Sequence, residues 1–381
     1  MSQSSEKLSN ACNNPGIDHI EIERPGLKEF HTTAIPSTDR SFATLMNQVA
    51  LMYRKQEARI VKMDVFGSYD TFKHCLDTIE KKFNSRDWPL NYVISEHWKG
   101  HKIAGAYIHA ISGVEIRTLK LEGQSYGRVF EDDSARYCIL GNVHAVDGSL
   151  SKAKQTQNIF EIMETGLQLA GMEFTNIVRT WFFNYEILNW YNTFNDVRTA
   201  FFKKKAVFNG LLPASTGIGG ANRYRTSIIA GASAIQPKND RISMENIPSP
   251  LQGSAFEYGS SFSRAVQIET PHYSQVLVSG TASIDPDGNT LHVGDVEAQI
   301  NQTLKVVEAI LRSRGMTYSD VSRVYAYVKR EKDTPIFTEY RKRYNIPEYR
   351  VIVVPNDICR EDLLFEIEVD AYSVKKITNK K

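Results

Sequence analysis

The chain has 381 residues, and 46 lysines and arginines nearly balance 44 aspartates and glutamates, which gives a net charge of +2. This interspersed charge argues against a nucleic-acid partner, and no apolar run reaches the roughly 18 residues that would span a bilayer. The N-terminal stretch MSQSSEKLSNACNNPG is polar where a signal peptide would be apolar, so we expect a cytoplasmic protein with no membrane partner.

The cysteines and the short motifs exclude several kinds of chemistry. Cys12, Cys75, Cys138 and Cys359 show neither a CxxC pair nor the Cys/His spacing of a metal site. The sequence also lacks an HExxH motif, a P-loop and a dinucleotide-binding fingerprint. We therefore expect no metal and no cofactor.

The N-terminal third follows a disordered tail at 1–15 and predicts a first unit at 16–122. Apolar residues between 42 and 52 and between 72 and 83 have the spacing of amphipathic helices, and strands are expected at 58–67, 90–98 and 102–111. This order echoes the later units without residue identity. Two hypotheses stay open: a degenerate copy of the later units, or an unrelated α+β domain.

The rest of the chain contains an internal repeat. The segment GMEFTNIVRTWFF at 171–183 matches GMTYSDVSRVYAY at 315–327, which places Gly171 on Gly315 and Arg179 on Arg323. Each glycine ends an amphipathic helix, where a left-handed C-terminal cap is favoured. The repeat indicates that two similar units follow the first.

Both repeats have the same predicted order of elements. A strand is expected before the long helix, at 138–146 and at 276–284, and a shorter helix follows, at 190–205 and at 333–345. Two strands close each repeat, VFNGLLPAS and RTSIIAGASAI in the earlier one and YRVIVVP and LLFEIEVDAY in the later one. The predicted boundaries are 123–236 for the second unit, a linker at 237–258, a third unit at 259–374 and a basic tail at 375–381.

The last predicted strand is the sharpest difference between the repeats. In LLFEIEVDAY, alternation places Glu366, Glu368 and Asp370 on one face, whereas the matching strand of the second unit has no acid. Buried acids are costly without partners, so this face must meet solvent, a cation or a ligand. Glu366 has the most apolar flanks and is the candidate general acid with a raised pKa. The alternative is an edge strand with a solvated face.

A second difference is the segment PASTGIGG at 213–220. Its glycines allow close approach of the backbone, and N–H groups beside Ser215 and Thr216 could form an anion-binding nest. Arg223 and Arg225 follow shortly and would suit a carboxylate. Ordinary turn chemistry is the alternative.

The third difference is the aromatic segment at 179–202. An aromatic stripe is most often core, but Tyr185, Asn195 and Arg198 are interleaved with it and suit the wall of a pocket for a ring-bearing anion. An ion pair between Arg198 and Asp196 is the structural alternative.

These motifs carry a resemblance. Residues 262–374 resemble a Rid/YjgF-family domain, through SGTASI, Arg350 after a Pro-containing turn, and EIEVDA. Residues 125–374 resemble the chorismatases, which share that fold, through RTWFFNYEI, YNTFNDVRTAFF, PASTGIG, FSRA, SGTASI and CREDLLFEIE in this order. The segment NYEILNWYNTF and Lys329, where an arginine would be expected, depart from the pattern and leave the position of the product's hydroxyl open.

The resemblance implies an α+β fold of tandem Rid/YjgF-like, chorismate-mutase-like layered repeats that form a pseudo-trimer in one chain, with a monomer expected and a homotrimer left open. It implies that chorismate is cleaved with release of pyruvate, giving a hydroxybenzoate, with 3-hydroxybenzoate favoured, or a dihydroxycyclohexadiene carboxylate. The implied catalytic residues are Glu366 and Cys359, although Cys359 could be a small hydrophobic residue. The candidate substrate-binding residues are Arg198, Tyr185, Ser215, Thr216, Gly217, Arg223, Arg225, Gly280, Lys329 and Arg350.

Two other functions stay open. Hydrolysis of 2-imino acids, the reaction of simpler Rid proteins, would need only Arg350 and Glu366. A non-catalytic protein that binds an aromatic acid is the other possibility, because this fold serves many functions.

Overall fold

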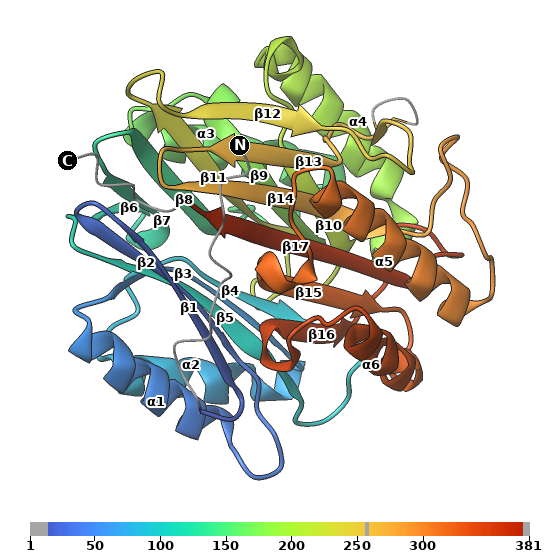
Figure 1. Ribbon diagram of the computed structural model, residues 1–381, viewed down its shortest axis with the longest axis horizontal. Helices are drawn as coiled ribbons and strands as arrows, with labels where there is room; N and C mark the ends of the chain where they lie inside the picture. The colour runs from blue at the N-terminus through green and yellow to red at the C-terminus, as the bar shows by residue number, and fades with distance from the viewer. Residues whose placement is uncertain (1–13, 256–258, 376–381) are drawn as a thin grey trace.

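Three α+β units make up the part of the chain that the computed structural model describes, residues 14–255 and 259–375 (Figure 1). We call them unit 1 (17–112), unit 2 (117–237) and unit 3 (243–374). Each has one sheet and two α-helices. The fold class expected from the sequence, a pseudo-trimer of repeats in one chain, is confirmed, and the degenerate copy is the better hypothesis for the N-terminal third.

Unit 1 has a five-stranded sheet in the order β1-β2-β5-β3-β4. Its elements are β1 (Ile17–Arg24), β2 (Leu27–Ala34), α1 (Phe42–Lys55), β3 (Arg59–Gly67), α2 (Phe72–Phe83), β4 (Leu90–Ile94) and β5 (Ile103–Ser112).

Unit 2 has a six-stranded sheet in the order β10-β9-β11-β8-β7-β6. Its elements are β6 (Arg117–Leu121), β7 (Gln124–Glu131), β8 (Ala135–His144), α3 (Lys152–Leu169), β9 (Ile177–Asn184), α4 (Tyr191–Lys204), β10 (Ala214–Gly219) and β11 (Ile228–Pro237).

Unit 3 repeats this plan in the order β12-β13-β14-β17-β15-β16. Its elements are β12 (Ser243–Ile247), β13 (Ala265–Glu269), β14 (Tyr273–Ala282), α5 (Val296–Arg312), β15 (Val321–Val328), α6 (Thr334–Arg343), β16 (Val351–Pro355) and β17 (Phe365–Val374).

Local sequence explains where the long helices begin and end. Ser41, Ser151 and Asp295 cap the N-termini of α1, α3 and α5 by accepting a hydrogen bond from the backbone N–H three residues later. Gly171 and Gly315, which follow α3 and α5, have φ of +71° and +69°. The left-handed ends predicted from the repeat are therefore confirmed. No helix among the described residues is long and apolar enough to cross a bilayer.

The sheets face one another at the centre and the helices lie outside (Figure 1). In each unit the two helices pack on one face of the sheet and enclose an apolar core. Leu45, Phe160 and Leu304 lie in the cores of units 1, 2 and 3. Two further apolar clusters draw residues from all three sheets. Apolar packing therefore joins the units and helps to fix the geometry of any site between them.

Two predicted elements and one of the alternatives differ from the observed structure. The segment 213–220 is not a glycine loop but contains strand β10, which pairs in parallel with β9. The predicted linker 237–258 contains β12, the edge strand of the third sheet. Strand β17 is not an edge strand, because it lies between β14 and β15 and its acidic face is buried.

Candidate active site

The cavity that contains Glu366 lies between units 2 and 3. Strand β10 approaches β14 there, and Ser263 beside β13 bridges to Ala214. Its walls come from α4, β10, β14, β17, the segment before β13 and the loop before β17. They comprise Tyr191, Arg198, Ser215, Gly217, Ser260, Phe262, Arg264, Gly280, Ala282, Ile284, Cys359, Arg360, Leu363 and Glu366.

Glu366 is 4% exposed and packs against the backbone of Gly280. A Cβ at position 280 would collide with Oε1 of Glu366, so only glycine leaves room for this carboxyl group. The neighbouring residues on β17, Phe365 and Ile367, point into the core of unit 3. The alternation predicted from the sequence thus places the acid in the cavity.

The environment of Glu366 keeps its carboxyl group protonated. Burial, helped by the negative charge of Glu368 and partly opposed by Arg179, raises the pKa of Glu366 to about 8. At neutral pH most of the molecules therefore hold a neutral carboxylic acid here, which is the form that can donate a proton.

Glu368 has the opposite environment. Its carboxylate accepts hydrogen bonds from Arg179 and Arg323 at 2.5 Å each and from the Trp181 indole at 3.0 Å. The Thr216 hydroxyl also donates to it. Burial alone would raise the pKa of Glu368, but the two guanidinium groups and these donors hold it at about 2. Glu368 is therefore a fixed negative charge beside Glu366.

Three arginines are found among the described residues that line the cavity: Arg198, Arg264 and Arg360. Arg198 comes from α4, donates to Oδ1 of Asn195 at 2.6 Å and lies over the rings of Phe194 and Phe262. Arg264 donates to the carbonyl of Gly253 at 2.9 Å, and Arg360 to that of Gly288 at 2.6 Å. With Glu366 neutral, these walls carry positive charge and suit an anion.

Cys359 lies at the edge of the same cavity. Burial and the nearby Glu366 raise the pKa of its thiol to about 12, so the group stays protonated at neutral pH. It can shape the cavity and offer a weak S–H donor, but it is not a thiolate nucleophile.

The predicted site residues fall into two groups. Glu366, Cys359, Arg198, Ser215, Gly217 and Gly280 line the cavity. Thr216 stands behind it, where its hydroxyl accepts from the N–H of Gly280 at 3.1 Å and donates to Glu368.

The other predicted residues lie elsewhere. Tyr185 is 42% exposed, and Arg223 and Arg225 are exposed on the segment after β10. Lys329 pairs with Glu361 at 3.1 Å and donates to its carbonyl. Arg350 is buried against Asp18. We remove these five from the site, since their side chains have other partners or face solvent.

Sequence reasoning missed Tyr191, Arg264 and Arg360 as cavity residues. Arg264 and Arg360 occur in the motifs FSRA and CREDLLFEIE, which carried the resemblance, so their positions were visible but no role was assigned. Tyr191 comes six residues after the exposed Tyr185, and its ring packs beside Gly217.

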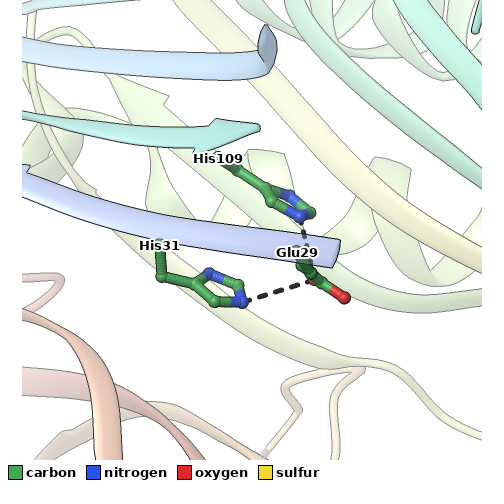
Figure 2. Close-up of side chains that lie close together, drawn as sticks. All are labelled: Glu29, His31 and His109. Atoms are coloured by element: carbon green, nitrogen blue, oxygen red, sulfur yellow. Dashed lines mark ion pairs between the residues drawn. The ribbon is translucent and has the colours of Figure 1, made fainter. Parts of the chain in front are cut away.

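A separate polar cluster lies in a central cavity that residues of all three units line. There the carboxylate of Glu29 is 2.8 Å from Nε2 of His109 and 3.3 Å from Nε2 of His31 (Figure 2). These atoms lie close enough together to hold a metal ion. However, Arg24 also pairs with Glu29 at 3.2 Å, and Tyr107 bonds the other ring nitrogen of His31 at 2.6 Å. We therefore interpret the cluster as a hydrogen-bonded ion network.

Comparisons with known proteins agree with this architecture. A family model described as Endoribonuclease L-PSP matches residues 253–373, which is essentially unit 3. A 3-hydroxybenzoate synthase of Streptomyces hygroscopicus is 25% identical over 275 residues, or 65% of this chain and 76% of that protein. A chorismatase of the same organism is 29% identical over 171 residues, or 41% of this chain and only 48% of the relative's own length.

The crystal structure of a chorismatase superimposes on this chain with a TM-score of 0.60 at 18% identity. The superposition covers 82% of this chain and 92% of the other, and it shows a shared fold. The resemblance to the chorismatase branch of the Rid/YjgF-like fold, first inferred from sequence motifs, is confirmed by these findings together.

Proposed function

We propose that this chain cleaves chorismate, releases pyruvate and leaves a hydroxybenzoate, with 3-hydroxybenzoate as the favoured product. The names of the two Streptomyces relatives support this function. The observation that carries it is the neutral carboxyl group of Glu366 in a cavity with arginine walls.

The reaction needs a proton donor that survives at neutral pH. The enolpyruvyl ether of chorismate is stable until its methylene carbon is protonated. Glu366 gives its proton to that carbon, and the ether becomes an oxocarbenium ion. The Glu366 carboxylate formed in this step then stabilises the positive charge.

The second half of the reaction separates the two products. Addition of water to the oxocarbenium carbon gives a hemiketal, which collapses to pyruvate and a ring alcohol. If the ring alcohol also loses its other hydroxyl group as water, together with the hydrogen on the carbon that carried the ether, it becomes aromatic and 3-hydroxybenzoate results. We place Cys359 beside the ring and infer that its neutral thiol helps to select the aromatic product.

Charge in the cavity suits this substrate. Chorismate carries two carboxylates, and Arg198, Arg264 and Arg360 provide guanidinium groups that can pair with them. The cavity measures about 40 Å³, whereas a cavity of about 150 Å³ is known to admit benzene. Substrate entry therefore requires side chains to move, and the partly exposed Arg360 is our candidate.

The structure separates the two residues, Arg350 and Glu366, on which the alternative of 2-imino acid hydrolysis depends. It would need Arg350 to bind the substrate carboxylate beside Glu366. The guanidinium of Arg350 instead donates to Asp18 at 2.5 Å and to the carbonyl of Val321 at 2.7 Å, and it does not line the cavity.

The decisive experiment is to incubate the purified protein with chorismate and to separate the products by chromatography. We expect pyruvate together with 3-hydroxybenzoate. Glu366→Gln keeps the shape of the side chain but has no carboxylic proton, so it should lower kcat at least about a hundredfold while chorismate still binds. Full activity of this variant would remove Glu366 from the mechanism, and ammonia release from an imino acid without pyruvate from chorismate would replace the proposed function. Tight binding of chorismate without turnover would favour a binding protein.

A further inference from the structure

A second cavity, between units 1 and 2, has no part in the proposed reaction. It measures about 200 Å³ and is lined by residues of α2, β4, β8 and β11, of the start of β7, and of the segments that precede β4 and β11. We propose that it is a non-catalytic binding site for a small aromatic carboxylate. This inference does not depend on which reaction occurs at Glu366.

Strand register shows that this cavity is the counterpart of the catalytic one. In unit 3, Glu366 of β17 pairs with Ala282 of β14. In unit 2, Ile229 of β11 pairs with His144 of β8, which occupies the place of Ala282 in the repeat. Ile229 therefore stands where Glu366 stands, and it lines the second cavity. The same kind of space is present without a proton donor, so ligand binding there cannot lead to the same chemistry.

At the third interface, between units 3 and 1, the corresponding cavity is filled by side chains. Gly105 of β5 pairs with Phe66 as Glu366 pairs with Tyr327, so it is the unit 1 counterpart. Side chains of Ile35 and Ile352 lie within 3.5 Å of where a Cβ of Gly105 would be, and they close the position. Of the three related positions, one has the acid, one is filled and one retains an open cavity.

The walls of the open cavity indicate the charge of its ligand. The described residues that line it include two arginines, Arg86 and Arg223, and no aspartate or glutamate. Arg86 has a long contact of 3.9 Å to Glu80. Arg223 is exposed as a residue, and its guanidinium donates to the Tyr224 hydroxyl and lies over the rings of Tyr224 at 4.4 Å and Phe72 at 5.7 Å. A planar, positively charged group in this setting suits a carboxylate.

Aromatic and polar side chains indicate the rest of the ligand. Trp88 and Tyr92 provide flat walls, and about 200 Å³ exceeds the roughly 150 Å³ that is enough for benzene. Asn142 is buried in the left-handed region, with φ of +56°, and its amide bonds the Tyr224 hydroxyl at 2.8 Å. Such a conformation is uncommon for a residue other than glycine and is often found at ligand sites. A single ring with one carboxylate and a hydroxyl fits these features.

Calorimetric titration of the full chain with 3-hydroxybenzoate tests the proposal. We expect a binding event that Arg223→Asn weakens at least about tenfold, because it removes a charge-assisted hydrogen bond. Arg225→Asn is the matched control: Arg225 is exposed, is absent from the cavity walls and has φ of +57°, which asparagine tolerates. Arg360→Asn reports separately on binding at the catalytic cavity.

The outcomes are distinct. Binding that Arg223→Asn weakens and that Arg225→Asn and Arg360→Asn preserve supports the second site, whether or not chorismate is cleaved. Absence of binding, or binding that only Arg360→Asn weakens, overturns it. A crystal grown with 3-bromobenzoate gives the position directly, since anomalous scattering from bromine should appear between α2 and β8 and would refute the site if it appeared only beside Glu366.

Discussion

Two glutamates that are neighbours on one face of β17 titrate in opposite directions. Glu368 keeps its charge because two guanidinium groups and a hydroxyl bind it. No such donor to Glu366 is found in the described part of the chain, and burial together with the charge of Glu368 raises its pKa. Separation of two nearby carboxyl pKa values is a common way to obtain one acid and one fixed anion in a single site.

The raised pKa of Glu366 predicts how activity depends on pH. The proposed mechanism requires the acid form, and a pKa of about 8 means that this form is present at neutral pH and is lost as the pH rises past 8. We expect kcat/KM for chorismate to be level between about pH 6 and 7.5 and then to fall about tenfold per pH unit above 8. A profile that instead rises towards pH 9 would mean that the ionised carboxylate is the active form.

Gly280 gives a second test at the same scale. A methyl group at this position would meet Oε1 of Glu366, so Gly280→Ala should displace the acid and lower kcat at least about tenfold. Gly210→Ala is the control, because a Cβ there meets nothing within 4 Å. Circular dichroism should show that both variants are folded; normal turnover of Gly280→Ala would show that the carboxyl group has room to move.

At the scale of single residues, the sequence located the candidate acid but only part of its surroundings. Alternation on one strand was enough to place Glu366 on the buried polar face. Arg264 and Arg360 come from distant segments, and no local pattern shows that they meet. Arg223 was predicted to bind the substrate, but it lines the cavity between units 1 and 2 and not the one with Glu366. The chain alone does not show which pair of units encloses an arginine that follows β10.

The elements of the site are strands whose backbones approach closely. Glycine at 217 and 219 suggested a loop, but in β10 the two residues allow contact with Tyr191 and with the backbone of Asp357. Local propensity favours a turn for PASTGIGG, and parallel pairing with β9 overrides it. The long helices were predicted closely because their apolar stripes and caps are encoded within each segment.

Because β17 lies between β14 and β15, Glu366 and Glu368 are both buried, and we expect the charge of one to affect the pKa of the other. Glu368→Gln removes the negative charge that raises the pKa of Glu366 and leaves Arg179 nearby, so the alkaline limit of kcat/KM should move down by about one pH unit or more. Loss of one partner of a buried ion pair should also cost about 3–5 kcal/mol of unfolding free energy.

Asp370→Asn is the matched control for this coupling. Asp370 also pairs with Arg323, at 2.7 Å, but it is not among the charges that shift the pKa of Glu366. The control should lower stability and leave the alkaline limit near 8. Equal movement of the limit in both variants would argue against a direct effect of Glu368.

In the whole molecule, the three units pack their sheets together within one chain, as three subunits would in a trimer. Equivalent positions of β3, β9 and β15 carry Lys62, Arg179 and Arg323, and the acids that pair with them come from units 1 and 3. Since the ring of sheets closes within one chain, we propose that the protein is a monomer. The resemblance suggested this arrangement. The sequence of unit 1 has diverged too far to show its equivalence to units 2 and 3, and at the position of Arg179 and Arg323 it has Lys62, which keeps only the positive charge.

One buried ion pair ties the two ends of the chain together and distinguishes the proposed function from its rival. Arg350, just before β16, pairs with Asp18 of β1, and both side chains are almost fully buried. Arg350→Met leaves the Asp18 carboxylate buried without its partner, so the unfolding free energy in guanidinium chloride should fall by about 3–5 kcal/mol. Because Arg350 does not line the catalytic cavity, KM for chorismate should stay within about twofold at a temperature where the variant is folded.

Arg312→Met is the control for loss of an arginine at the surface. Arg312 forms an exposed pair with Glu308 on α5, and its loss should cost less than about 1 kcal/mol. If Arg350→Met instead raised KM more than tenfold and left the unfolding midpoint where the control has it, Arg350 would be a substrate ligand. The arginine would then lie beside Glu366, as the imino acid reaction requires, and the buried Arg350–Asp18 pair between units 3 and 1 would be refuted.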